Sequence, residues 1–275
     1  LDVSALQTAS HLTSEQSSAV LSSIQNRISV ITGGPGTGKT SIIVELLRCV
    51  CTLGILPHRI ALAAPTGKAA YRMGESIQRA LNTADDGLSA HLAEHLASPM
   101  TIHRLLDYRP WSGLFGRHEE ARIKADLIII DEMSMVDAEL ALSILNAVGS
   151  DTRLVLLGDP GQLPSVGVGA VLRDLVNSPE VTISTLTKSF RMNESDPAGS
   201  KVYQVSRWLL DAHPDLLKLP SLKSTWAEWI DAPSLGVHFT PSTPTDITQF
   251  IDGWYERFYR TSTWQRIAQP FDDNM

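Results

Sequence analysis

The sequence predicts an α/β domain in which helices flank a parallel β-sheet. From about residue 14 to residue 187, short apolar runs rich in β-branched residues alternate with helix-compatible segments. Strands of a parallel sheet are buried on both faces, so they read as continuous apolar runs rather than as alternating patterns. With 275 residues, 43% of them hydrophobic and 19% charged, the chain has the composition of a globular protein that can bury a large core.

The predicted elements alternate in order along the chain. Five apolar runs are predicted to be strands, namely 28–32, 59–64, 125–130, 153–158 and 181–186. Helices are predicted near 39–53, 66–81, 137–148 and 168–177. Residues 82–98 are polar and contain Asp85-Asp86-Gly87, which indicates an inserted loop with room for a short helix.

The composition changes after residue 192. Residues 193–200 read as a turn-rich linker and 202–212 as a helix, and prolines and tryptophans are scattered through the rest. We therefore predict one domain over 1–192 and, over 193–275, a partial second domain or a connecting helical segment. The tryptophans are interpreted as core anchors rather than as base-stacking residues.

A glycine-rich segment between the first predicted strand and the next helix has the pattern of a phosphate-binding loop, G-x-x-x-x-G-K-[ST]. Its glycines allow backbone N–H groups to converge on an anion at the positive end of the helix dipole. Lys39 is expected to reach the β- and γ-phosphates, and the Thr40 hydroxyl to ligate Mg²⁺. The predicted nucleotide-binding residues are Gly33, Gly34, Pro35, Gly36, Thr37, Gly38, Lys39 and Thr40.

Two carboxylates, Asp131 and Glu132, come directly after the apolar run 127–130. At the carboxyl end of a central strand, Asp131 can hold Mg²⁺, often through water. Glu132 is then placed to polarise the water that attacks the γ-phosphate. Such a pair alone is weak evidence, but its place after an apolar strand and a phosphate loop favours a site of ATP hydrolysis.

The strand predicted at 153–158 leads into a polar loop that contains Gln162. This glutamine can hydrogen-bond the γ-phosphate or its attacking water and so sense hydrolysis. A loop glutamine that faces solvent is an equally good interpretation of the spacing.

The strand predicted at 59–64 leads into Pro65-Thr66-Gly67-Lys68 at the start of a helix. Thr66, the Gly67 backbone and Lys68 can contact the phosphates of a nucleic-acid backbone. In isolation, a helix cap followed by a surface lysine is the more common meaning of this pattern.

Taken in order, these blocks resemble the motifs of the superfamily-1 DNA helicases. Within them they look most like the RecD family, the alpha subunit of exodeoxyribonuclease V. The resemblance covers about residues 11–212. The matching blocks beyond the phosphate loop are APTGKAA at 64–70, TIHRLL at 101–106, DEMS at 131–134, GDPGQLP at 158–164 and LTKSFR at 186–191.

The resemblance assigns further residues. Gln16 is similar to the Q-motif glutamine that reads adenine, although Thr13 and Gln16 also fit a capping box that opens the first helix. Thr101 and His103 lie in a block similar to a DNA-facing motif. Arg191 ends a block similar to motif IV, whose arginine contacts the γ-phosphate, and a surface salt bridge is the weaker alternative.

The resemblance implies a RecA-like P-loop NTPase fold for 1–192 and an ATP hydrolase that uses Mg²⁺. Lys39, Glu132, Gln162 and Arg191 would carry the hydrolysis. It also implies 5′→3′ travel on single-stranded DNA, a role in recombinational repair within a helicase-nuclease, and RecB- and RecC-like partner subunits. No counterpart of the family's motifs V and VI is found after residue 192, so we interpret the chain as the first motor domain plus part of a further segment.

Two other functions remain open at this point. The domain can be an ATP-binding regulatory or scaffolding module of the nuclease complex without motor activity of its own. It can also be a phosphate-loop kinase or NTPase unrelated to DNA, against which the TGKAA and GDPGQLP blocks argue. The net charge of −7 is a weak argument against a nucleic-acid partner, because a local groove matters more than the sum.

Composition argues against other classes of protein. No apolar run approaches the roughly 18 residues of a membrane span, and no signal peptide is recognised, so a cytoplasmic protein without membrane contact is expected. The chain starts at Leu1, which leaves open a fragment of a longer protein. Cys49 and Cys51 are interpreted as reduced core residues, because two thiols cannot complete a zinc site.

Overall fold

The computed structural model describes residues 12–190 and residue 252. The chain separates into two compact units, Leu1–Arg191 and Met192–Met275, and the fold given below is that of the first. Arg191, the predicted linker at 193–200 and the predicted helix at 202–212 lie outside the described residues. The division into a motor domain and a partial second domain stays a prediction.

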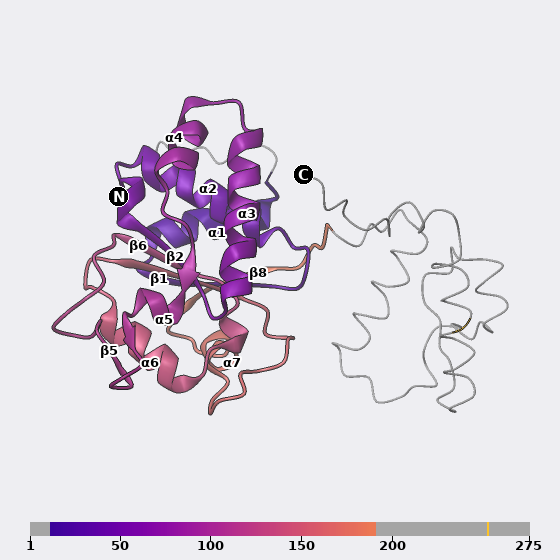
Figure 1. The fold of residues 1–275 in the computed structure, drawn as a ribbon. Helices are drawn as coiled ribbons and strands as arrows, with labels where there is room; N and C mark the ends of the chain where they lie inside the picture. Colours follow the sequence, from indigo (N-terminus) through magenta and orange to yellow (C-terminus); the bar gives the residue numbers. More distant parts are fainter. Residues whose placement is uncertain (1–11, 191–251, 253–275) are drawn as a thin grey trace, which may run out of the picture. The chain divides into compact units, whose positions relative to one another are not determined.

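A six-stranded sheet forms the centre of this unit, and every pairing in it is parallel (Figure 1). Its strands stand in the order β3-β2-β6-β7-β1-β8. Their bounds are β1 Ile28–Gly33, β2 Ile60–Ala64, β3 Met100–Thr101, β6 Leu127–Ile130, β7 Arg153–Gly158 and β8 Thr182–Leu186. The predicted α/β fold with a parallel sheet flanked by helices is confirmed.

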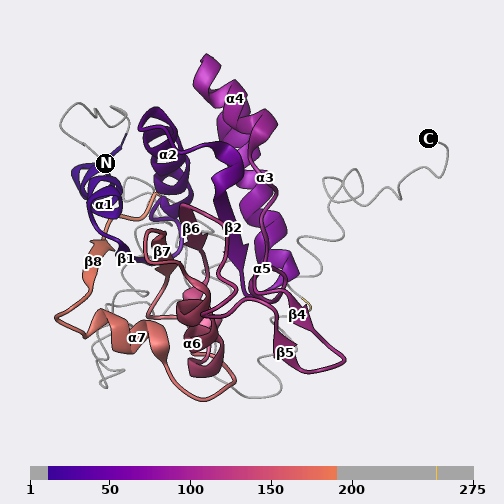
Figure 2. The same ribbon diagram turned by 90° about the vertical axis from the view of Figure 1, so that its left-hand side faces the viewer.

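Helices cover both faces of the sheet (Figures 1 and 2). One face carries the helices α1 Ser14–Gln25, α2 Lys39–Thr52, α3 Gly67–Thr83 and α4 Gly87–His95. The other face carries α5 Ile102–Leu105, α6 Ala138–Ala147 and α7 Val171–Val176. Leu127 and Ile129 of β6 belong to the core on the first face, and Ile128 and Ile130 to the core on the second. This double burial is why the strand reads as an unbroken apolar run.

Some local predictions need correction. The predicted helix at 168–177 is shorter, because Gly169 has φ +99° and α7 begins only after it. Residues 82–98 contain the end of α3 and all of α4, whose N-terminus is capped by Asp86. The predicted elements also lack β3 and a hairpin formed by β4 Tyr108–Arg109 and β5 Leu114–Phe115. Strands of two residues are too short to leave a periodic signal.

The parallel arrangement has one consequence for function. All six strands end at the same edge of the sheet, and the chain leaves each of them there to reach the next helix or loop. In α/β sheets, ligands bind at this carboxyl edge. Every segment singled out in the described part of the sequence, except the start of α1, comes after one of these strand ends.

Candidate nucleotide-binding site

The phosphate loop connects the end of β1 to the start of α2. Gly36 and Gly38 have φ of +78° and +85°, which L side chains rarely adopt. Lys39 Nζ donates hydrogen bonds to the carbonyl oxygens of Gly33 at 2.6 Å and of Gly34 at 3.3 Å. Thr37 Oγ1 also donates to the Gly34 carbonyl, at 2.9 Å. The loop is therefore held in shape by its own side chains.

The start of α2 differs from those of most other helices, and shares the lack of a side-chain cap with α7. The helices α1, α3, α4, α5 and α6 each begin with a side chain that accepts a hydrogen bond from a first-turn amide. The N-cap residue of α2 is Gly38, which offers no side-chain cap. Its first amides and the positive end of its dipole are thus available to an anion. Thr40, the predicted Mg²⁺ ligand, lies in this first turn.

Gln16 is buried beside the phosphate loop, with 3% of its surface exposed. Its Oε1 accepts a hydrogen bond from the Thr13 amide at 3.0 Å, and its Nε2 donates to the Thr37 carbonyl at 3.0 Å. The capping-box interpretation of Thr13 and Gln16 is confirmed. Both ends of the Gln16 amide are bonded within the protein, and a contact with adenine stays a prediction.

The acidic pair comes directly after β6, as predicted. Glu132 has φ +57°, a backbone conformation that is uncommon outside glycine, and its amide donates to Asp131 Oδ1 at 2.8 Å. Burial raises the pKa of the Asp131 carboxyl, while the Glu132 amide and the Lys39 ammonium oppose this rise. Burial and then the Asp131 charge raise the pKa of Glu132. A raised pKa makes Glu132 a stronger base, as the predicted role requires.

A divalent cation suits this donor set. Mg²⁺ is usually held by one or two protein oxygens together with nucleotide phosphates and waters. The Thr40 hydroxyl and the Asp131 carboxylate supply such oxygens. The Lys39 ammonium favours the charged form of buried Asp131, because it opposes the rise in the pKa of this carboxyl. No group of three or more His, Cys, Asp or Glu side chains that could hold a metal ion is found among the described residues.

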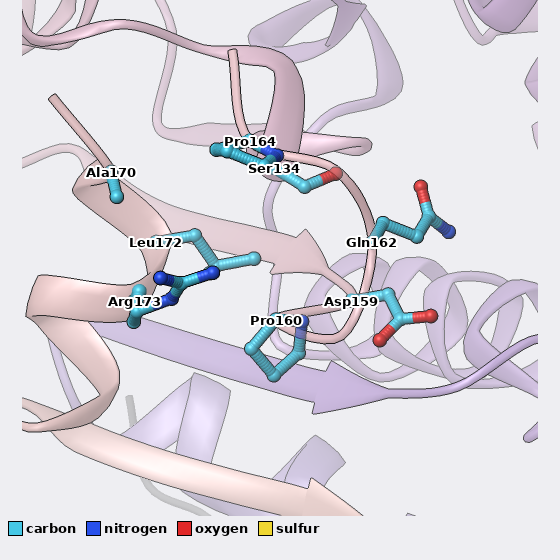
Figure 3. Close-up of a pocket in the computed structure, with 8 residues that line it drawn as sticks. All are labelled: Ser134, Asp159, Pro160, Gln162, Pro164, Ala170, Leu172 and Arg173. Carbon is cyan, nitrogen blue, oxygen red and sulfur yellow. The ribbon is translucent and has the colours of Figure 1, made fainter. Parts of the chain in front are cut away.

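The loop after β7 carries Gln162. Its side chain is exposed and points to the same side as that of Asp159 (Figure 3). Asp159 Oδ1 accepts a hydrogen bond from the Gly161 amide at 3.0 Å, which shapes the turn. A pocket here is lined by Ser134, Asp159, Pro160, Gln162, Pro164, Ala170, Leu172 and Arg173. The Ser134 hydroxyl is buried without a hydrogen-bond partner in the described part of the chain. The exposure of Gln162 fits both interpretations of this residue, and its role in sensing the γ-phosphate stays a prediction.

The two predicted DNA-contact blocks lie side by side. Ala64 at the end of β2 pairs with Thr101 at the end of β3. Pro65 is half-buried, and Thr66, Gly67 and Lys68 are exposed. The hydroxyls of Thr66 and Thr101 act as helix caps, accepting from the amides of Ala69 and Arg104 at 3.2 Å each. His103 is exposed, and its ring meets that of Tyr108 edge-on at 5.4 Å between centroids. These helix caps do not test whether the two blocks contact DNA, and that contact stays a prediction.

The stretch after β8 belongs to the motif IV-like block, and its contacts with the phosphate loop are not predicted by the sequence. Residues 187–190, named here the exit segment, run over the phosphate loop. The Phe190 amide donates to the Gly36 carbonyl at 2.7 Å, and Ser189 Oγ donates to the Pro35 carbonyl at 3.1 Å. At the start of the segment, Thr187 is bonded to Glu15 of α1. The sequence gives only an indirect indication of these contacts. The helicase resemblance places Arg191 at the nucleotide, so the residues just before Arg191 are expected near the phosphate loop.

Comparison with known proteins identifies the family. A family model described as an AAA domain matches residues 16–168, more than half of the chain, including every block from Gln16 to Gln162. The chain belongs to this AAA domain family. Within residues 12–190, no helix is both long and apolar enough to cross a membrane.

Curated relatives confirm the RecD resemblance. The chain is similar to the RecBCD enzyme subunit RecD of Mycolicibacterium smegmatis, with 42% identity over 187 residues, which cover 66% of this chain and 33% of the relative. It is similar to the ATP-dependent RecD2 DNA helicase of Deinococcus radiodurans, with 37% identity over 186 residues, covering 68% of this chain and 22% of that one. The chain thus spans about a third or less of the length of these relatives.

Among solved structures, the Pif1 helicase of Candida albicans is similar with a TM-score of 0.48 and 20% identity, over 70% of this chain and 44% of that one. A Bacteroides sp. Pif1 in complex with ADP-AlF4 is similar with a TM-score of 0.45 and 23% identity, over 85% and 59% of the two chains.

Proposed function

We propose that this chain is the first motor domain of an ATP-dependent DNA helicase that moves on single-stranded DNA. The observation that carries the proposal is the order of the segments along one edge of the sheet. From β3 through β2, β6 and β7 to β1 and β8 they are the two DNA-contact blocks, the acidic pair, Gln162, the phosphate loop and the exit segment. The acidic pair and Gln162 lie between the blocks proposed for DNA and the loop proposed for the nucleotide. The names of the RecD and RecD2 relatives support the same function.

The proposed hydrolysis gives each of these groups a separate task. Lys39 contacts the β- and γ-phosphates, and Thr40 and Asp131 would hold Mg²⁺, which would offset the charge that develops on the phosphates. Glu132 accepts the proton of the attacking water. Gln162 and Arg191 contact the γ-phosphate, so that its presence or loss is felt beyond the nucleotide. Gln16 is proposed to contact adenine as well as the loop.

The proposed DNA contacts are made by Pro65, Thr66, Gly67, Lys68, Thr101 and His103. The positive end of the α3 dipole and the exposed Lys68 in its first turn lie at this edge, which favours the phosphates of a single strand with little reading of bases. Travel in the 5′→3′ direction and assembly with RecB- and RecC-like subunits are proposed from the RecD relationship.

The test is ATP hydrolysis by this chain with and without single-stranded DNA. We expect DNA to stimulate turnover, and Lys39→Ala to lower it by at least about 100-fold, because the ammonium stabilises charge that grows in the transition state. Lys124→Ala, which removes an exposed lysine outside every one of these blocks, is the matched control and should turn over like the wild type.

Three outcomes would redirect the proposal. Unchanged ATPase activity in Lys39→Ala would show that the phosphate loop is wrongly assigned. Mg²⁺–ATP binding without DNA-stimulated turnover would instead support the alternative, an ATP-binding regulatory or scaffolding module. Phosphate transfer to a small acceptor in place of water would support a kinase.

A further inference from the structure

The exit segment and the phosphate loop are joined by backbone carbonyls. Three successive carbonyl oxygens of the loop accept hydrogen bonds from outside it: Pro35 from Ser189 Oγ, Gly36 from the Phe190 amide and Thr37 from Gln16 Nε2. The first two donors belong to the exit segment and the third to α1. The loop is thus held from outside along one side.

These bonds fix where the loop amides point. In a trans peptide unit the C=O of one residue and the N–H of the next point in opposite directions. The hydrogen bonds hold the carbonyls of residues 35–37 on the outer side of the loop. The N–H groups of residues 36–38 therefore point toward the inner side. Successive N–H groups that face one side form an anion-binding nest, which is what a phosphate loop requires.

Glu15 holds the exit segment at its start. The carboxylate receives two hydrogen bonds from one residue: Oε2 from the Thr187 amide at 3.0 Å, and Oε1 from Thr187 Oγ1 at 2.6 Å. The Thr187 hydroxyl and then its amide lower the pKa of Glu15, so the carboxylate is charged at neutral pH. Glu15 and Gln16 are consecutive, so the first turn of α1 contacts both the exit segment and the loop.

We propose that Glu15 is a positioning residue of the nucleotide site, which seats the exit segment on the phosphate loop and so orients the amides that bind phosphate. The inference rests on the proposed nucleotide site. Glu15 acts through Thr187 and contacts no phosphate itself. At the other end of the exit segment, the hydrogen bond from the Phe190 amide to the Gly36 carbonyl holds the chain one residue before Arg191.

The sign of the effect separates this role from simple electrostatics. A carboxylate near a polyphosphate site repels the ligand, so removing its charge should tighten nucleotide binding if charge alone mattered. If Glu15 positions the exit segment, its removal should weaken binding in spite of the lost repulsion. The two explanations therefore predict opposite changes.

The experiment is calorimetric titration of the folded chain with Mg²⁺–ADP and with inorganic pyrophosphate. We expect Glu15→Ala to weaken both affinities by about three- to tenfold, the usual effect of losing a partly exposed hydrogen bond to a charged group. Thr187→Val, which keeps the shape of the side chain and removes the hydroxyl, should give part of the same loss of affinity. In the double variant the fold-loss of affinity should be smaller than the product of the two single fold-losses, because both substitutions remove the same contact. Glu15→Gln, whose Oε1 can accept from the Thr187 amide while its Nε2 donates to the Thr187 hydroxyl, should restore affinity.

Glu75→Ala is the matched control. Like Glu15, Glu75 accepts a hydrogen bond from a hydroxyl, that of Tyr71 at 3.2 Å, but it is exposed and lies in α3 away from the loop. It should bind as the wild type does. Unchanged or tighter binding in both Glu15→Ala and Thr187→Val would overturn the inference. A wild-type chain that binds neither ligand would instead overturn the proposed nucleotide site, so the two failures are distinguishable.

Discussion

The phosphate loop and the acidic turn after β6 lie at the same edge of the sheet but are held in different ways. In the loop, five successive carbonyls, those of residues 33 to 37, accept hydrogen bonds from Lys39, Thr37, the exit segment or Gln16. On the acidic side, the Glu132 and Gln162 side chains have no hydrogen-bond partner in the described range 12–190, and neither has the Ser134 hydroxyl.

The difference separates binding from catalysis. A phosphate loop has one task, to present amides to an anion, and it gains affinity when these are oriented beforehand. A base and a sensor must form their bonds with the substrate, and then release them after hydrolysis. The strained backbone of Glu132, with φ +57°, fits a side chain that is aimed by its strand end rather than by partners. Substitutions on the two sides should therefore fail in different ways.

The largest expected effect is on the acidic side. Glu132→Gln keeps the size of the side chain and removes the base, so turnover should fall by about 10² to 10⁴-fold while ATP still binds. Steady-state ATPase rates and equilibrium ATP binding check this together. Glu139→Gln, an exposed carboxylate in the first turn of α6, is the control and should leave both unchanged. Loss of tight Mg²⁺–ATP binding along with turnover would assign Glu132 to metal ligation instead.

The phosphate loop should respond through stability and binding. Gly38 has φ +85°, and a Cβ there would meet the Gln16 amide, so Gly38→Ala should cost about 1 to 3 kcal/mol of folding free energy and weaken ATP binding. Gly34→Ala in the same loop meets no atom within 4 Å and should cost much less. Urea denaturation and ATP titration compare the two. Equal effects would mean that the outer contacts of the loop do not matter.

The same contrast governs how much can be predicted from the sequence. The prediction of a strand at 153–158 is correct to the residue. Both faces of β7 are buried, so residues that point to either face are apolar and the sequence shows an unbroken apolar run. The carboxyl-edge location of Asp131 and Gln162 is evident from strand ends alone. Helix boundaries are harder to predict. The helix predicted at 168–177 is too long, because a glycine can adopt positive or negative φ and the sequence does not show that Gly169 takes a positive one.

The contacts that hold the phosphate loop cannot be predicted in this way. Glu15 and Thr187 are 172 residues apart, and Ser189 and Pro35 are 154 apart. Each contact joins side chains or backbone of distant residues by hydrogen bonds alone, which leaves no periodicity, capping pattern or apolar run. Glu15 reads as an acidic residue in the first turn of a helix, a place where such residues are favoured by the helix dipole without any partner.

The smallest expected effect tests the open loop after β7. Gln162 is exposed and Leu163 beside it is 88% exposed, so Gln162→Ala and Leu163→Ala should each change stability by less than about 0.5 kcal/mol. If Gln162 contacts the γ-phosphate, Gln162→Ala alone should lower turnover by about tenfold, the loss of one hydrogen bond to a charged group, with ATP affinity nearly unchanged. Thermal denaturation and ATPase assays on both variants decide the matter. Normal turnover in both would mean that Gln162 faces solvent throughout the cycle, and that sensing of the γ-phosphate has to come from the side of the exit segment.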